Sequence, residues 1–291
     1  MRIALTLALA MVSATAFADD HDGYDRATAE GLLQATADAT SGVAAPHMNA
    51  PRFAFGVHFP HEAPDTVEDV KGGDEVDIAS VNLHAKSGTT VAYAADGTAA
   101  WVAADIWASA VCGMASCMHD KPDPMHATAL YDKAGGWQPV TWLASRVYSG
   151  AEQAKAIAAA VKLMEIARKI DGAEDVVNQV EATIGDAKAL AATVSARKDV
   201  VLYGSDLGER YVGGAAVRAK LVAWNLAFKV RDGIQAGVTS SKTVAWVAAN
   251  VDASSAKHPK DKPVPYRMLL VYEKTGSAWQ LVQAQFSFSD I

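Results

Sequence analysis

The sequence is poor in cysteine, in basic clusters and in long apolar runs, and each shortage excludes a class of protein. Two cysteines in 291 residues exclude a disulfide-rich scaffold. Lys and Arg number 26 against 33 Asp and Glu, and no basic stripe carries aromatic residues, so nucleic acid and anionic membrane are not expected partners. The G-x-S-x-G, P-loop and Rossmann fingerprints are also absent from the sequence.

The N-terminus has the pattern of a secretory signal peptide. Arg2 supplies a positive charge, residues 3–12 are apolar apart from Thr6, and Ala16-Phe17-Ala18 is a small-residue cleavage site before an acidic stretch. We therefore expect loss of residues 1–18 and a periplasmic or secreted mature protein without a membrane anchor. An uncleaved anchor is the alternative, but the apolar run is shorter than the ~20 residues that span a bilayer.

The most informative feature is an internal repeat, because self-similarity at a fixed offset indicates duplicated structural units. Residues 98–106 and 243–251 are identical at six of nine positions, at an offset of 145. Further matched blocks follow in the same order: 120–124 with 261–265, 131–135 with 272–276, and 137–140 with 279–282. These blocks pair Trp, Tyr and Pro residues, and they predict two copies of one domain.

In the second copy, helices precede strands. Apolar spacing predicts a helix over residues 176–184, a short helix capped by Asp186 and a third helix over 213–224. Strands are expected at 200–203, 226–230, 235–239, 243–251, 266–273 and 279–288. Helices followed by an antiparallel meander define an α+β fold rather than a parallel βαβ sheet.

The repeat also sets the domain boundaries. We expect the first copy at residues 19–148, a linker helix at 149–172 that begins with the Ser149–Glu152 capping box, and the second copy at 173–291. The first copy is eroded, because Gly72-Gly73 stands where the second copy has a helix. Pro139 interrupts its last strand, which should therefore be an edge or carry a bulge.

A Tyr-[Asp/Glu]-Lys-x-Gly turn before a Trp strand occurs at Tyr131 and again at Tyr272. Together with residues 200–205, 243–249 and 279–287, it resembles the SnoaL-like family, part of the superfamily of nuclear transport factor two and ketosteroid isomerase. The resemblance implies two cone-shaped domains, each a bent antiparallel sheet packed on N-terminal helices around a cavity. Members often dimerise through the sheet, which implies an intramolecular pseudo-dimer of the two copies.

The last strand departs from the family pattern. Where that pattern tends to carry two histidines that face the cavity, this chain has Gln283 and Gln285, which cannot shuttle protons at neutral pH. We therefore expect a non-catalytic protein without a cofactor that binds a small, fairly apolar ligand or a protein partner. Its pocket should lie in the second copy, lined by Tyr203, Asp206, Trp246, Asn250, Gln283 and Gln285. The alternative is an isomerase, cyclase or hydratase that uses a cavity carboxylate such as Asp206.

Cys112 and Cys117 lie in residues that the second copy lacks. In an oxidising compartment, this pair favours a disulfide that closes a short loop. The alternative is a soft-metal site, because the same segment gathers ligands that suit Cu(I): Cys112, Met114, Cys117, Met118, His119, Met125 and His126. His58 and His61 enclose Pro60, which removes the helical geometry of an H-E-x-x-H site. We expect the disulfide and no metal.

Overall fold

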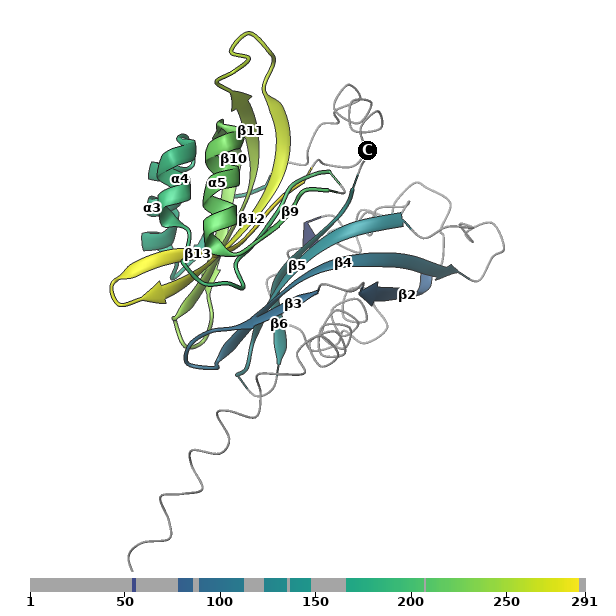
Figure 1. Ribbon diagram of the computed structural model, residues 1–291. Coiled ribbons are helices and arrows are strands. Elements are labelled where there is room, and N and C mark those ends of the chain that lie inside the picture. The colour runs from purple at the N-terminus through teal and green to yellow at the C-terminus, as the bar shows by residue number, and fades with distance from the viewer. Residues whose placement is uncertain are drawn as a thin grey trace, which may run out of the picture.

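The structure is a computed structural model that describes residues 54–55, 78–85, 89–112, 123–134, 137–147, 166–206 and 208–287. Within these ranges the chain forms two curved sheets, one from each half, and three helices that lie beside the second sheet (Figure 1). Several predicted features lie outside the described residues: the signal peptide, Cys117, the His58–His61 segment, Gly72-Gly73 and residues 149–165 of the expected linker helix.

The first sheet has the strand order β1-β6-β5-β4-β2, with β3 also beside β4. Its strands are β1 (Ala54–Phe55), β2 (Ile78–Ala85), β3 (Thr90–Tyr93), β4 (Ala99–Cys112), β5 (Asp123–Asp132) and β6 (Gln138–Arg146). Strands β4, β5 and β6 form an antiparallel meander, and β1 runs parallel to β6. The β5–β6 register shifts where Tyr131 pairs with Pro139, so the bulge predicted from the proline is confirmed.

The second sheet has the order β7-β10-β11-β12-β13-β8-β9. Its strands are β7 (Lys169–Asp171), β8 (Val201–Tyr203), β9 (Arg210–Val212), β10 (Leu226–Val238), β11 (Val244–Ser255), β12 (Val264–Thr275) and β13 (Ala278–Ser287). Strands β10 to β13 form an antiparallel meander, and β8 runs parallel to β13. The β12–β13 register also shifts, between Val271 and Tyr272.

Three helices cover one face of the second sheet, and all three agree with the sequence prediction (Figure 1). They are α3 (Glu174–Thr183), α4 (Ala187–Thr193) and α5 (Gly214–Trp224). The Asp186 side chain caps α4, because it accepts hydrogen bonds from the backbone N–H groups of Lys188 and Ala189 at 2.8 Å. Helix α5 ends at Trp224, and the next residue, Asn225, has a φ of 52°, the left-handed conformation common just after helices.

The second sheet buries both of its faces, because successive strand residues point to opposite sides. On β11, Ala245, Val247 and Ala249 join the apolar cluster formed with the helices. Trp246 and Ala248 join a different cluster, which also contains Trp101, Leu130 and Leu143 of the first sheet. The second sheet therefore lies between the helices and the first sheet.

Two sequence predictions are wrong in detail. Lys169–Asp171 is strand β7, which pairs in parallel with β10, so the linker helix does not reach Ile170. The two strands expected at 226–230 and 235–239 are one strand, β10, with an irregularity between Val230 and Ile234. A Cβ at Gly233 would collide with the Ile166 carbonyl oxygen, so residues 166–168 can cross the sheet there only because the position is glycine.

Candidate functional site

The predicted pocket residues do not line the face of the second sheet that meets the helices. Trp246 lies in the cluster between the two sheets, and Tyr203 stacks on a first-sheet histidine, His126. Asn250 is buried and donates from Nδ2 to Asp232 Oδ2 at 3.0 Å. Asp206 lies in the turn between β8 and β9, where its Oδ1 accepts from the Gly208 N–H at 2.9 Å. These four residues therefore contact the first sheet, Asp232 or the β8–β9 turn.

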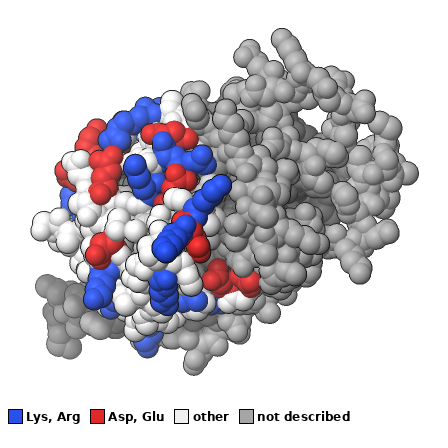
Figure 2. Space-filling model, turned by 90° about the horizontal axis from the view of Figure 1, so that it is seen from above, with Lys and Arg blue, Asp and Glu red and all other residues white. Residues whose placement is uncertain are grey.

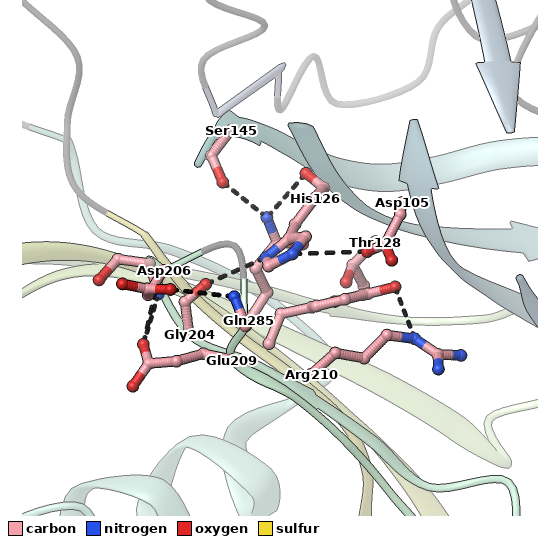
Figure 3. Close-up of polar contacts among 12 residues, drawn as sticks. Asp105, His126, Thr128, Ser145, Gly204, Asp206, Glu209, Arg210 and Gln285 are labelled. Carbon is pink, nitrogen blue, oxygen red and sulfur yellow. Dashed lines mark hydrogen bonds and ion pairs between the residues drawn. The ribbon is translucent and has the colours of Figure 1, made fainter. Parts of the chain in front are cut away.

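The two glutamines of β13 bind the first sheet. Gln283 donates from Nε2 to Thr128 Oγ1 at 2.8 Å. Gln285 donates from Nε2 to the His126 carbonyl oxygen at 3.1 Å and to Ser145 Oγ at 2.9 Å (Figure 3). A carbonyl oxygen only accepts, so the contact with His126 fixes the amide orientation of Gln285. Both glutamines are fully buried, and they join the two halves of the chain.

A polar junction surrounds His126, which β5 places at one end of the contact between the sheets (Figure 3). The imidazole is fully buried and stacks on the Tyr203 ring, with the centroids 4.2 Å apart. Its Nδ1 lies 3.2 Å from the Gly204 carbonyl oxygen, and its Nε2 lies 3.4 Å from Asp105 Oδ1. Asp105 stands directly opposite His126 in the β4–β5 register. The junction thus combines side chains from both halves of the chain.

Tyr203 is held neutral in this junction. Burial raises the pKa of its phenol well above the ordinary value, and the Asp105 carboxylate raises the pKa further. Arg210 opposes this shift, and its Nε donates to Tyr203 Oη at 3.2 Å, while a second guanidinium nitrogen donates to Thr90 Oγ1 at 3.1 Å. A neutral, buried phenol cannot serve as a base at neutral pH.

The carboxylates that follow β8 shape a turn rather than a pocket. Glu209 Oε2 accepts from the backbone N–H groups of Ser205 at 3.1 Å and Asp206 at 3.3 Å. The carboxylate folds back over Gly204, where any Cβ would collide with it. Asp206 and Glu209 therefore stabilise the path of the chain beside His126, and Glu209 Oε1 also lies 4.0 Å from Lys220 Nζ on α5.

The helix-facing side of the second sheet is apolar. Its buried cluster is formed by aliphatic and aromatic side chains from the helices and from strands β10 to β13, with Leu270, Phe286 and Tyr272 near its centre. Burial raises the pKa of the Tyr272 phenol well above its ordinary value.

Among the residues that the structure describes, no three His, Cys, Asp or Glu side chains come together as a metal site. None of the described helices is long and apolar enough to cross a membrane. Basic and acidic side chains are interspersed on the described part of the surface seen in Figure 2, so this face has no basic stripe.

Comparison with known proteins finds a similarity over part of the chain. Residues 178–290 match the model of the SnoaL-like domain. No curated protein matches the chain.

Several solved structures resemble part of the chain. A Parabacteroides distasonis protein named as a ketosteroid isomerase is 18% identical over 40% of this chain and 86% of its own, with a TM-score of 0.33. An NTF2-like protein of unknown function from Pseudomonas putida is 12% identical over 40% of this chain and 83% of its own, with a TM-score of 0.32. One from Shewanella oneidensis is 18% identical over 40% of this chain and 98% of its own, with a TM-score of 0.31.

Proposed function

We propose that the protein is a single-chain dimer of two SnoaL-like units that binds a ligand or a protein partner without catalysing a reaction. The units are residues 19–148 and 173–291. Strand order supports the duplication, because β8-β13-β12-β11-β10 repeats the first sheet's β1-β6-β5-β4-β2. The bulges support it as well, since the registers skip Val140 in one sheet and the matching Val282 in the other.

Reciprocal contacts at the edge of the interface also support a dimer-like arrangement. The Ala95 N–H donates to Glu273 Oε1 at 2.7 Å, and the Ser240 N–H donates to Asp132 Oδ2 at 2.5 Å. Ala95 corresponds to Ser240 in the sequence repeat, and Asp132 corresponds to Glu273. Each half thus offers the same backbone donor to the same acidic position of the other half, as expected for a two-fold interface.

Matching positions of the two repeats also meet in the interior of the interface. Trp101 and Trp246, which occupy matching positions in the repeat, lie in one apolar cluster between the sheets. Arg197 joins the halves beside that cluster, because it donates to the Tyr93 carbonyl oxygen of the first half at 2.9 Å while it pairs with Glu273 Oε2 of its own half at 2.7 Å. Its guanidinium also lies 5.0 Å from the centroid of the Trp101 ring.

One observation carries the non-catalytic part of the proposal: Gln283 and Gln285 point away from the helices and bind the first half. Gln283 and Gln285 therefore stabilise the interface, although the family pattern tends to carry histidines that face the cavity at these positions. The isomerase, cyclase or hydratase alternative needs a carboxylate inside the cone, and Asp206 is used in a turn. The soft-metal alternative includes His126, whose ring faces Asp105 and Gly204.

The location and the cysteine pair remain part of the proposal. We place the mature protein in the periplasm or outside the cell after loss of residues 1–18, because of the Ala16-Phe17-Ala18 site. In that compartment we expect Cys112 and Cys117 to be bonded to each other.

Two experiments test the proposal. Native mass spectrometry of the mature protein, purified after secretion by its own cells, should show a bound mass that denaturation releases, or cross-linking before purification should capture a protein partner covalently. The bare polypeptide mass without a cross-linked partner would contradict binding. Separately, Gln283→Leu and Gln285→Leu should each lower the free energy of unfolding by about 1–3 kcal/mol, because buried partners lose a donor. Unchanged stability would show that these amides do not hold the interface.

A further inference from the structure

The His126 junction is a strong structural feature that the proposed function does not use. The imidazole belongs to the first half, and three of its surroundings belong to the second: the Tyr203 ring, the Gly204 carbonyl oxygen and the Arg210 guanidinium near Tyr203. The side chain is 1% exposed, and Asp105 beside it is 30% exposed. The ring therefore sits where the two halves meet, buried beside a partly exposed carboxylate.

The two ring contacts together select a protonation state. Nδ1 faces a carbonyl oxygen at 3.2 Å, and Nε2 faces a carboxylate oxygen at 3.4 Å. A neutral imidazole carries one N–H, so one of its nitrogens would direct a lone pair at an oxygen. Only the doubly protonated ring directs a proton to both acceptors. We propose that His126 is held as an imidazolium and that it makes the junction between the two halves a pH-sensitive lock.

The groups that face the ring come from several elements. Asp105 on β4 supplies the near negative charge, and Asp206 and Glu209 add acidic groups in the β8–β9 turn (Figure 3). Arg210 on β9 brings a positive charge next to the neutral Tyr203 on β8, and it opposes a charged imidazole. Ser145 on β6 and Gln285 on β13 are uncharged. Burial also disfavours a charged ring, and the Asp105 carboxylate offsets this cost.

The direction of the pH effect follows from the two acceptors. In the unfolded chain the ring has neither acceptor in place, so the folded junction favours the protonated form. The stabilisation is therefore complete in acid, and it declines as rising pH removes the second ring proton. This inference rests on the junction alone, so it holds whether or not the proposed ligand or partner is found.

The first test is the protonation state of the ring. Long-range ¹H–¹⁵N NMR spectra of the full-length protein, with His126 assigned by its loss in His126→Gln, should show both ring nitrogens protonated at about pH 7. A single neutral tautomer at that pH would overturn the proposal. Asp105→Asn removes the facing charge, so the ring of that variant should lose its second proton at lower pH than in the unmodified protein.

The second test is the pH dependence of stability, measured over roughly pH 5 to 9. At the acid end of this range, the folding equilibrium constant of the unmodified protein should exceed that of His126→Gln. The factor between the two constants should fall by up to about tenfold per pH unit as the ring deprotonates. His258→Gln is the matched control, because His258 is exposed in the β11–β12 hairpin. An advantage of constant size across the range would refute the lock. If His126→Gln does not fold, Asp105→Asn takes its place in this comparison.

Discussion

Two buried threonines in the interface offer a matched test of the hydrogen bonds between the halves. Thr128 Oγ1 accepts from Gln283 Nε2, whereas Thr141 Oγ1 has no hydrogen-bond partner among the described residues. Both side chains are almost completely buried, on adjacent strands of the first sheet. Thr→Val keeps the shape and the β-branched character of the side chain and removes only the hydroxyl, so the two substitutions differ in one hydrogen bond.

The expected magnitudes have opposite signs. Thr128→Val leaves the Gln283 amide without this acceptor, which should lower the free energy of unfolding by about 1–3 kcal/mol. Thr141→Val removes a buried hydroxyl that is already unpaired, so stability should stay the same or rise by up to about 1 kcal/mol. Denaturant unfolding with an unchanged m-value measures both effects.

The repeat supplies a second pair for the same test. Ser145 Oγ accepts from Gln285 Nε2, and its counterpart Ser287 has no hydrogen-bond partner for Oγ among the described residues. Ser145→Ala should therefore cost stability, and Ser287→Ala should not. Equal losses from the two threonine variants, or from the two serine variants, would refute the assigned pattern of hydrogen bonds.

Four further outcomes are expected. Trp101→Ala and Trp246→Ala should each lower the free energy of unfolding by roughly 3–5 kcal/mol, because both rings fill the same apolar cluster. A small loss of stability from either substitution would show that its ring lies outside this cluster. Gly233→Ala should destabilise the protein, since the new Cβ meets the Ile166 carbonyl oxygen, and a neutral result would contradict that close crossing. Thiol titration without reductant should find no free thiol, and two reactive thiols would refute the Cys112–Cys117 disulfide. N-terminal sequencing of secreted material should begin at Asp19, and an intact Met1 would refute cleavage.

The second half of the fold could be predicted closely because its signals are local. Asp186 is an acceptor at a helix N-terminus, and apolar spacing marked the buried sides of α3 and α5. Strand β7 was missed because Ile166 and Ile170 continue the helical apolar spacing, and parallel pairing with β10 leaves no local signature. The single strand β10 was missed because its irregular segment ends at Gly233, which reads as a turn.

The site could be predicted only in part, since strand alternation groups residues on a face without saying what covers that face. The sequence predicts Trp246 and Asn250 as parts of one lining, but it carries no local signal that the first sheet covers Trp246. The role of His126 was missed for the same reason, since its partners Tyr203 and Gly204 lie 77 and 78 positions away, in the other half.

A signal for the junction was nevertheless present in the repeat. Asp105, His126 and Ser145 stand opposite one another across β4, β5 and β6. Their counterparts Asn250, Arg267 and Ser287 stand opposite one another across β11, β12 and β13. Polar residues in matching rows of otherwise apolar strands indicate that both sheets turn this row toward a polar neighbour rather than toward a core. Only the first row pairs a carboxylate with an imidazole, so the two ends of the interface are chemically different, and a pH response is expected at the His126 end.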